Sequence, residues 1–163
     1  RHSSSAASDV YKRQDIHRFD DGEYLTLGGV KIPFSKGLQA HSDGDVLVHS
    51  LIDAILGAIN AGDIGAHFPD DDVQYKNANS LDLLQNIYKL MSSEGYFLMN
   101  MDATIILEKP KLNKYINKMK ENIAETLNCS KNILSIKATT SEGIGFVGRQ
   151  EGIACLCSIL LDK

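Results

Sequence analysis

The segment from Asp45 to Asn60, DVLVHSLIDAILGAIN, constrains the fold more than any other part of the sequence. Its length and its content of Ala, Leu and Ile favour a helix over a strand, and Asp43 and Asp45 are candidate N-cap residues. Three polar residues, Asp45, His49 and Asp53, recur at intervals of four and therefore share one face, whereas the other faces are apolar. This polar stripe needs an explanation that an ordinary core helix does not provide.

Helix and strand patterns alternate along the rest of the chain without a long linker or an internal repeat. Two short β-like runs flank Gly28 and Gly29, which predicts a hairpin over 24–33 because both glycines can take positive φ. The other patterns predict helices over 79–95 and 112–127, and strands over 101–107, 133–139 and 152–161, the last in the middle of a sheet. These elements indicate a single domain with an α+β or α/β layer fold.

The segment 62–79 separates the first two predicted helices and is expected to be a loop. Pro69 and the aspartates Asp70, Asp71 and Asp72 argue against regular structure there. A polar loop of this length, next to a candidate site, is a candidate lid.

The composition excludes several classes of function. With 163 residues and a net charge of −4, the chain has no surplus of cations to offset nucleic-acid phosphates. It also has no run of about eighteen apolar residues, as a membrane span requires. An anionic substrate would therefore be held by metal ions, backbone N–H groups and a few local cations. Three cysteines without a C-x-x-C motif indicate buried thiols in a reducing compartment, so we expect a cytoplasmic protein, or an organellar one if a plastid leader was lost.

The first fourteen residues, RHSSSAASDVYKRQ, are interpreted separately. They lack the apolar core of a secretory signal, and they look like translated adapter sequence joined to a truncated gene. We therefore expect residues 1–14 to be a non-native, loosely packed tail and residues 15–163 to form the domain.

A metal site is the sharper explanation of the polar stripe. Asp15 and His17 form a D-x-H pair, and residues two apart in an extended segment project to the same face. With His49 as a third ligand, the set suits catalytic Zn²⁺ with an open fourth position, and it also suits the facial triad of Fe(II) oxygenases. A simpler alternative is that Asp45 caps the helix while His49 and Asp53 hydrogen-bond to each other. The residues alone leave these alternatives open.

Two further segments could bind phosphate. Residues 39–45, QAHSDGD, precede the first helix, where free N–H groups favour an anion, although a simple capping turn explains them equally well. Residues 139–143, TTSEG, follow a predicted strand and offer hydroxyls, N–H groups and a carboxylate. The glycines of G-x-G-x-x-G over 143–148 precede a predicted strand rather than opening a helix, so a Rossmann site is rejected in favour of a tight loop that carries Arg149.

Four segments, in this order, resemble the 2-C-methyl-D-erythritol 2,4-cyclodiphosphate synthase family: D-x-H at 15–17, AHSDGDVLVHSLIDAILGA at 40–58, GDIGAHFPD at 62–70 and KATTSEGIGFVGRQEGIAC at 137–155. The resemblance runs from Asp15 to the C-terminus. It implies an α+β fold of the chorismate-mutase-like type, with a mixed β-sheet covered by helices on one face, in a homotrimer whose sites lie between subunits. It further implies that the Leu107–Asn113 pocket and the zinc ligands of one site come from different subunits, and that Arg149 and Glu151 pair across chains near the three-fold axis.

The resemblance also implies the reaction. A phosphorus–oxygen lyase of the non-mevalonate isoprenoid pathway converts the CDP-linked substrate, 4-diphosphocytidyl-2-C-methyl-D-erythritol 2-phosphate, into 2-C-methyl-D-erythritol 2,4-cyclodiphosphate and CMP. The substrate's own 2-phosphate attacks the β-phosphorus, so no enzyme nucleophile is needed, and catalysis consists mainly of positioning and charge stabilisation.

The site residues implied by this resemblance fall into three groups. Asp15, His17 and His49 bind Zn²⁺, and Glu142 binds a second divalent cation, Mg²⁺ or Mn²⁺. His41 and Thr140 are catalytic and steady the transition state, while Ser42 contacts the methylerythritol phosphate. The remaining substrate-binding residues are Asp63, Ile64, Gly65, Phe68, Pro69, Asp70, Asp71, Asp72, Leu107, Glu108, Lys109, Pro110, Lys111, Leu112, Asn113, Thr139, Ser141, Phe146 and Arg149, with the cytosine held by backbone groups of 107–113.

One departure from the family pattern affects the metal site. Family members begin with a strand that ends in Gly and an aromatic residue before the aspartate, whereas Arg13 and Gln14 precede Asp15 here. We therefore expect weakened backbone support for the ligands. Two rivals stay open: an Fe(II) oxygenase that uses the same three ligands, and a trimeric binding protein without turnover.

Overall fold

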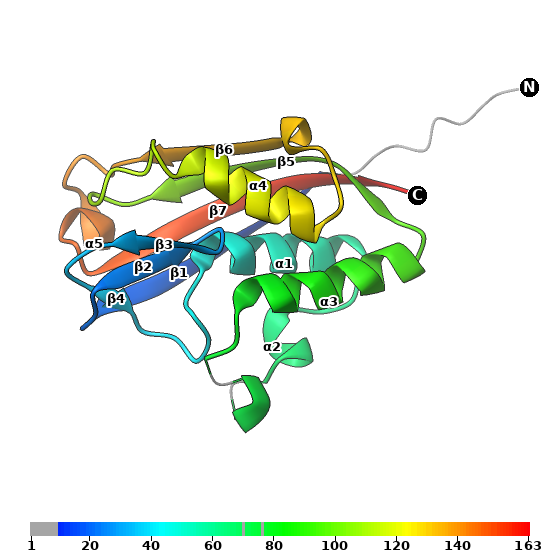
Figure 1. Cartoon of the computed structure of the whole chain (residues 1–163), viewed down its shortest axis with the longest axis horizontal. Helices are drawn as coiled ribbons and strands as arrows, with labels where there is room; N and C mark the ends of the chain where they lie inside the picture. Colours follow the sequence, from blue (N-terminus) through cyan, green and yellow to red (C-terminus); the bar gives the residue numbers. More distant parts are fainter. Residues whose placement is uncertain (1–9, 70, 76) are drawn as a thin grey trace, which may run out of the picture.

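A five-stranded mixed sheet forms the centre of the molecule. The computed structural model describes residues 10–69, 71–75 and 77–163. The strands are β1 (Val10–Asp20), β4 (Gly37–Leu38), β5 (Phe97–Ile106), β6 (Leu134–Thr139) and β7 (Gly152–Asp162), in the order β4-β1-β7-β5-β6 (Figure 1). β5 and β6 run parallel, and the other pairs are antiparallel. The last strand is the central one, which confirms its predicted place.

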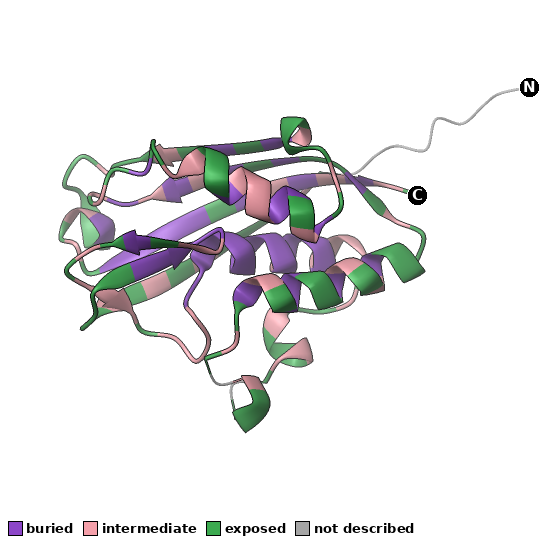
Figure 2. Cartoon of the chain, in the orientation of Figure 1, coloured by how far each residue is buried: buried purple, intermediate pink, exposed green. Residues whose placement is uncertain are grey.

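Helices cover one face of this sheet. α1 (Val46–Ala58) packs on β1 and β7, α4 (Ile116–Thr126) packs on β6, and α3 (Ser80–Ser93) packs against both helices (Figure 1). Along β7, Ile153, Cys155 and Cys157 are fully buried, whereas Leu156 on the other face is 39% exposed. The core therefore lies between the sheet and α1, as the buried residues in Figure 2 show. No helix among the described residues is both long enough and apolar enough to cross a membrane.

The predicted hairpin is confirmed. β2 (Tyr24–Leu27) and β3 (Val30–Pro33) form a two-stranded antiparallel sheet, joined by Gly28 and Gly29 with φ of 56° and 69°. A Cβ atom at Gly28 would lie 2.6 Å from Cβ of Met119, so the turn also needs glycine in order to approach α4.

Short helical turns correct the prediction for the segment 62–79. It contains α2 (Ile64–His67) and the 3₁₀ turn η1 (Val73–Tyr75), with the side chains of Asp63 and Asp72 accepting hydrogen bonds from backbone N–H groups in these turns. The expectation of an irregular loop was wrong because these aspartates cap short helices. A further 3₁₀ turn, η2 (Lys131–Ile133), precedes β6, and α5 (Gly145–Gly148) precedes β7.

Other boundaries shift by a few residues. α4 begins at Ile116 rather than Leu112, whose side chain is buried in the core before the helix starts. β5 begins at Phe97, four residues before the predicted start, because pairing with β7 extends it beyond Met101, where pairing with β6 begins. Among the thiols, Cys155 and Cys157 are buried as expected, and Cys129 is half-buried.

The expectation of a loosely packed tail is wrong for residues 10–14. They form the first half of β1 and pair in regular register with β7, from Val10 opposite Leu160 to Gln14 opposite Leu156. Asp15 therefore keeps its backbone support, and the weakening expected from the departure at Arg13 and Gln14 is not found. Residues 1–9 lie outside the described part of the chain, and the adapter-like origin of residues 1–14 stays a prediction.

Candidate metal centre

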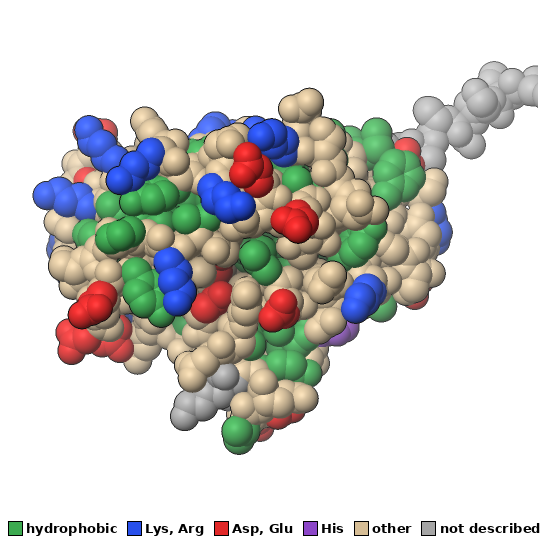
Figure 3. All heavy atoms as spheres, in the orientation of Figure 1, with side chains coloured by type: hydrophobic (Ala, Val, Ile, Leu, Met, Phe, Trp, Pro, Cys, Tyr) green, Lys and Arg blue, Asp and Glu red, His purple; other side chains and the backbone are tan. Residues whose placement is uncertain are grey.

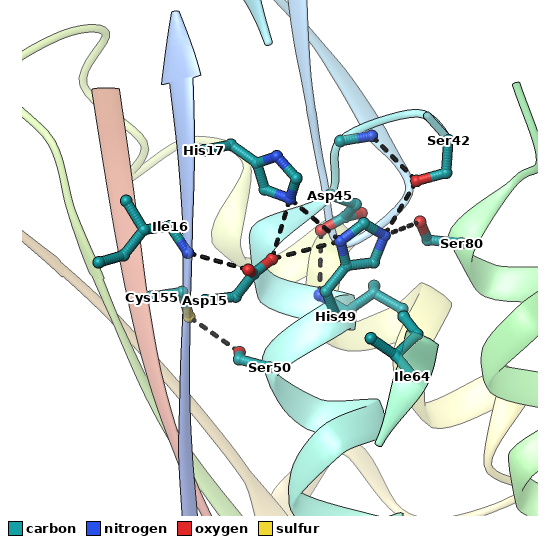
Figure 4. A network of polar contacts seen from close by, with 12 residues as sticks. Asp15, Ile16, His17, Ser42, Asp45, His49, Ser50, Ile64, Ser80 and Cys155 are labelled. Carbon is teal, nitrogen blue, oxygen red and sulfur yellow. Dashed lines mark hydrogen bonds and ion pairs between the residues drawn. The ribbon is translucent and has the colours of Figure 1, made fainter. Parts of the chain in front are cut away.

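The sheet and the first helix together position three candidate ligands. Asp15 and His17 lie two apart on β1, and the register of β1 with β7 places them opposite Cys155 and Ile153, on the face that carries α1. Asp45 caps α1 by accepting a hydrogen bond from the backbone N–H of Val48, at 3.1 Å. The cap fixes the start of α1, so that His49 reaches the same point from one turn inside the helix (Figure 4).

The three ligand atoms form a nearly equilateral triangle. Asp15 Oδ2 lies 3.1 Å from His17 Nε2 and 3.2 Å from His49 Nδ1, and the two nitrogen atoms are 3.3 Å apart. Ligands bound at about 2.0–2.1 Å to a tetrahedral Zn²⁺ ion are about 3.3 Å from one another. The triangle therefore has the size of one face of a tetrahedral metal site, and the predicted convergence of these residues is found.

The electrostatics of the triangle favour a positive charge at its centre. Burial alone would raise the pKa of Asp15, but the hydrogen-bonding and charge interactions with His17 and His49 hold it well below its usual range. Burial alone would lower the pKa of His17, yet the hydrogen bond and charge of Asp15 raise it. Asp15 Oδ2 is buried, and its close polar contacts among the described residues are the two ring nitrogens, so a proton or a metal ion must lie between this oxygen atom and each nitrogen. A cation would satisfy this atom, so the residues present fit a metal ion.

His17 is held in the form that a metal needs. Its Nδ1 atom lies 3.0 Å from the carbonyl oxygen of Gln39, which can only accept a hydrogen bond. The ring therefore donates through Nδ1–H, and in its neutral form the lone pair of Nε2 faces Asp15 and His49, where a metal ion would take it. Sequence reasoning missed Gln39 because its backbone, not its side chain, makes the contact.

A cavity of about 340 Å³ opens beside the three ligands. Five predicted residues, His41, Ser42, Ile64, Gly65 and Phe68, line it together with Asp15, His17 and His49. Sequence reasoning did not assign the other lining residues, which are Gln39, Ala40, Asp53, Tyr75 and Leu83. The metal triangle thus faces a pocket that has space for a small ligand.

Asp53 has a different role from the one that spacing allowed. Its Oδ1 atom accepts a hydrogen bond of 2.7 Å from the backbone N–H of Ile64, so it holds the start of α2 at the cavity. The alternative in which His49 and Asp53 bond to each other is therefore wrong. Burial raises the pKa of Asp53, and the nearby carboxylates Asp63 and Asp15 act in the same direction.

The polar loop contributes less to the cavity than predicted. Asp63 caps α2, and Asp72 accepts hydrogen bonds from Gln74 while its carbonyl oxygen lies 3.3 Å from His41 Nε2. Pro69 and Asp71 are exposed and do not line the cavity. Asp70 lies outside the described residues. Contacts of these residues with a substrate stay predictions.

The second predicted group of site residues gathers at another end of the sheet. Thr139 ends β6, and the loop that follows carries Thr140, Ser141 and Glu142. Glu108 organises this loop, because its Oε1 atom accepts hydrogen bonds from Ser141 N at 3.0 Å, Ser141 Oγ at 2.9 Å and Gly143 N at 3.3 Å. The structure thus brings the segment 107–113 next to the TTSE loop, with the side chain of Glu108 as the connection.

Glu142 is exposed and has an unusual backbone. Its φ is 54°, a left-handed conformation that costs a non-glycine residue about 1–2 kcal/mol. Its carboxylate accepts a hydrogen bond of 2.9 Å from Thr140 Oγ1. Backbone strain of this kind concentrates at functional sites, which is consistent with the predicted role of Glu142.

The segment 107–113 presents backbone and cations rather than apolar side chains. The side chains of Leu107 and Leu112 are buried in the core, whereas Lys109, Lys111 and Asn113 are exposed and Pro110 is half-buried. Basic side chains gather over the end of the molecule that carries this segment, at the upper left of Figure 3. A nucleotide could contact only backbone groups and the polar side chains here.

Arg149 and Phe146 lie at α5, close to the start of β7. Arg149 Nε is 2.8 Å from Glu151 Oε1, in an exposed ion pair within the chain. Within one chain these two residues pair with each other, and their pairing across chains stays a prediction. Phe146 is 37% exposed and lines an apolar hollow on the face of the sheet without helices. The glycine motif over 143–148 contains the short helix α5, which corrects the expected tight loop, and the predicted strand, β7, follows it.

The two groups are far apart within one chain. Cross-strand neighbours link Ile16 of β1 through Ala154 and Ile106 to Thr139 of β6. Three strand spacings of about 4.8 Å separate Ile16 from Thr139, or about 14 Å. Within the described ranges, the metal-ligand cluster contains Asp15, His17 and His49 but not Glu142. The structure therefore brings the zinc ligands together and leaves Glu142 with the other group.

Fold and site define an α+β domain with a candidate metal site, and comparison with known proteins identifies its family. The YgbB family matches residues 12–162. Proteins named 2-C-methyl-D-erythritol 2,4-cyclodiphosphate synthase from Acinetobacter baumannii (strain SDF) and Geobacillus thermodenitrificans are each 52% identical, over 91% of this chain and 92% and 93% of their own.

Solved structures agree. The CDP complex of IspF from Plasmodium falciparum is 34% identical with a TM-score of 0.81, covering 93% of this chain and 94% of that one. The bifunctional IspDF of Campylobacter jejuni is 44% identical with a TM-score of 0.88, covering 95% of this chain, which spans 42% of that longer protein. The chain belongs to the 2-C-methyl-D-erythritol 2,4-cyclodiphosphate synthase family.

Proposed function

We propose that this chain converts 4-diphosphocytidyl-2-C-methyl-D-erythritol 2-phosphate into 2-C-methyl-D-erythritol 2,4-cyclodiphosphate and CMP in isoprenoid precursor synthesis. The observation that carries the proposal is the triangle of Asp15, His17 and His49, which faces a cavity lined by His41 and Ser42. Its relatives, 52% identical over most of the chain, bear the name of the enzyme that makes this product.

The proposed metal at the triangle is Zn²⁺, bound by Asp15 Oδ2, His17 Nε2 and His49 Nδ1. These three side chains would hold the ion and leave a position open for substrate, where it would supply a Lewis acid for the β-phosphate. The donor set also suits Fe(II), so the choice of zinc rests on the family and on the phosphate chemistry rather than on geometry.

The protein's own groups position the substrate for an internal attack. An oxygen atom of the 2-phosphate forms a bond to the β-phosphorus, and the bond from the β-phosphorus to the oxygen atom shared with the α-phosphate breaks. CMP leaves with that oxygen atom, and no side chain becomes bonded to phosphorus. His41 and Ser42, at the mouth of the ligand triangle, hold the methylerythritol phosphate, while Asp53 keeps Ile64 and Gly65 at the wall of the cavity. Holding the two phosphates in line accounts for much of the rate.

A second divalent cation, Mg²⁺ or Mn²⁺, is proposed at Glu142. A carboxylate oxygen is a ligand that such ions prefer, and Glu142 is exposed on a loop that Glu108 holds in shape. Thr140, which hydrogen-bonds to Glu142, lies where it can steady the transition state. The exposed lysines of the segment 107–113 add positive charge near the proposed nucleotide site.

We propose that three chains assemble, in the chorismate-mutase-like arrangement, so that each site combines the zinc ligands of one subunit with Glu142 and the segment 107–113 of the next. Two observations support this. The two groups lie about 14 Å apart within one chain by the strand-spacing estimate. The sheet face without helices also exposes Ile16, Leu156 and Phe146 around an apolar hollow of about 480 Å³, and such a patch marks an interface.

A direct assay tests the function. Purified protein is incubated with the CDP-linked substrate, Zn²⁺ and Mg²⁺, and CMP and the cyclic product are measured by chromatography and ³¹P NMR. We expect stoichiometric CMP and cyclodiphosphate, and loss of both on chelation. Elemental analysis that finds iron and no zinc, together with no CMP, would overturn the proposal in favour of the oxygenase. Zinc binding without turnover by the trimer would instead favour a non-catalytic binding protein.

The same sample tests the assembly. Ile16→Glu places a charge on the apolar face, remote from the ligand atoms of Asp15 and His17, which point to the other face. We expect sedimentation to report a trimer for the parent chain and smaller species for the variant, with zinc retained and CMP formation lost. A fully active monomer would contradict sites shared between subunits.

A further inference from the structure

A buried chain of hydrogen bonds runs outward from His49, away from the metal triangle. The Nε2 atom of His49 lies 2.8 Å from Oγ of Ser80, the first residue of α3 (Figure 4). Ser80 Oγ in turn bonds to Oδ1 of Asp43, and the backbone N–H of Ser80 donates to Asp43 Oδ2 at 3.0 Å. Ser80 is completely buried and His49 is buried, so water does not compete for the bond between their side chains, whereas Asp43 is half-buried.

The chemistry of the three groups fixes the direction of each bond. An ionised carboxylate can only accept, so the hydroxyl hydrogen of Ser80 points to Asp43. The oxygen atom of Ser80 then presents its lone pairs to His49, and Nε2 of His49 must carry the hydrogen. A neutral imidazole has a single N–H, so Nδ1 keeps its lone pair. That lone pair faces Asp15 Oδ2 at 3.2 Å and His17 Nε2 at 3.3 Å.

We propose that Ser80 and Asp43 are positioning residues that select the tautomer and the ring orientation of His49 in which it binds the metal. The inference rests on the proposed metal at Asp15, His17 and His49. Loss of the hydrogen-bonded partner on the other ring nitrogen of a metal-binding histidine typically lowers metal affinity about 10- to 100-fold. The pair acts through His49 and touches neither the substrate cavity nor the metal.

Ser42 is the competing partner, and the structure separates its role from that of Ser80. Its hydroxyl is 3.1 Å from His49 Nε2, longer than the contact of Ser80, and Ser42 is half-buried and lines the cavity. Since Nε2 has one hydrogen atom and Ser80 takes it at 2.8 Å, the hydroxyl of Ser42 is available to a ligand. Ser80 therefore orients the metal ligand His49, whereas the hydroxyl of Ser42 can bind the substrate.

The arrangement also joins two helices at the metal. Ser80 begins α3, and Asp43 lies in the turn before α1, with its Oδ1 atom accepting the backbone N–H of Asp45 at 3.3 Å. The helix that carries the ligand and the helix that carries its partner are thus held by one carboxylate. Placement of α3 on α1 consequently sets the orientation of the His49 ring.

The test measures zinc affinity by competition with a chromogenic chelator, on metal-free protein whose fold is checked by circular dichroism. Ser80→Ala should weaken zinc binding about 10- to 100-fold, and Ser80→Thr, which keeps the hydroxyl, should restore it to within about 3-fold. Ser50→Ala is the matched control: Ser50 is also fully buried on α1, but its hydroxyl bonds to Leu47 and Cys155 instead of His49. It should leave zinc affinity unchanged.

Two spectroscopic measurements separate positioning from simple loss of stability. Nitrogen NMR of the metal-free parent chain should show His49 protonated at Nε2, and Ser80→Ala should show a mixture of tautomers. The d–d absorption of the Co²⁺-loaded protein should shift in Ser80→Ala but not in Ser50→Ala. Equal zinc affinity and the same His49 tautomer in Ser80→Ala and the parent chain would overturn the inference alone. Failure of the parent chain to bind zinc would instead overturn the proposed function.

Discussion

The metal triangle and the Glu142 loop are built on opposite principles, although the proposed reaction needs both. The triangle is half-buried or buried, and Gln39 and Ser80 hold its two histidines. Glu142 is exposed, takes a left-handed backbone conformation, and has Thr140 as its hydrogen-bond partner. One chain therefore brings Asp15, His17 and His49 together by itself. The carboxylate of Glu142 does not converge with these ligands within the described part of the chain.

The difference separates groups that core packing positions within one chain from groups that lie on an exposed loop. Groups that must meet at one atom with little tolerance are fixed by the core, because packing of α1 on β1 and β7 leaves His49 little freedom. Groups that bind a flexible nucleotide can lie on a loop, here the segment 140–143, which hydrogen bonds to Glu108 hold in shape. We expect changes in the first region to affect metal content, and changes in the second to affect turnover at full metal content.

The largest expected effect separates the two regions most clearly. His49→Ala removes one of three ligands, and zinc should be lost on dialysis together with at least about 10³-fold of the activity, the several kcal/mol that a Lewis acid contributes. Metal analysis and the CMP assay measure both. Retained zinc with full activity would show that the triangle is not the metal site.

Glu142→Gln should break the function of the loop without changing the triangle. We expect kcat to fall about 10²- to 10³-fold, in the range for loss of one group that stabilises transition-state charge, at unchanged zinc content. The Mg²⁺ concentration for half-maximal activity should rise. A parallel loss of zinc would show that the two regions are not independent.

Glu108→Ala tests whether the Glu142 loop depends on its hydrogen bonds to Glu108. The change removes the acceptor of three hydrogen bonds from Ser141 and Gly143, so Glu142 should lose its fixed position. We expect kcat/KM to fall about 10-fold, by analogy with residues that orient a ligand, and zinc affinity to stay constant. Asn117→Ala, on the outer face of α4, is a surface control. An unchanged Mg²⁺ dependence would remove Glu108 from the mechanism.

The smallest expected effect concerns stability beneath the triangle. Burial, with the neighbouring charge of Asp43, raises the pKa of Asp45 to about 6. Because the folded chain binds this proton more tightly than an unfolded aspartate of pKa about 3.9, the contribution of Asp45 to stability is largest below pH 4 and declines as the pH rises through 6. The stability of Asp45→Asn relative to the parent chain should therefore increase by roughly 1–3 kcal/mol between pH 4 and pH 7.

Urea unfolding of metal-free protein at the two pH values measures this difference. Asp43 is the neighbouring charge that acts on Asp45, so the same experiment on Asp43→Asn shows how much of the shift that charge supplies. A pH-independent difference between Asp45→Asn and the parent chain would mean that Asp45 titrates normally.

Local patterns predicted most of the fold. The turn glycines at 28 and 29 and the periodicity of α1 and α3 located these elements closely, because they depend on neighbours in the sequence. The short helices α2 and η1 were missed because Asp63 and Asp72, interpreted as loop residues, act as caps. β1 was underestimated for another reason: residues 10–14 have no strong strand pattern and gain their structure from pairing with β7.

The candidate site could be predicted in its chemical groups but not in its connections. Asp15, His17 and His49 were identified from spacing and from family resemblance, and the structure brings them together. Ser80 was not assigned to the site, because its contact with His49 spans 31 residues and leaves no local signal. Glu108 was assigned to the nucleotide, whereas its side chain binds the loop 33 to 35 residues further on.

The triangle takes two ligands from the sheet and one from the helix that covers it, so an ion bound there would cross-link the two layers of the protein. Occupancy would then add to resistance against heat and proteases in proportion to the logarithm of free metal over its dissociation constant. Loss of the ion would then expose this enzyme to degradation as well as to inactivity. The abundance of the protein would thereby report the metal supply on which its pathway depends.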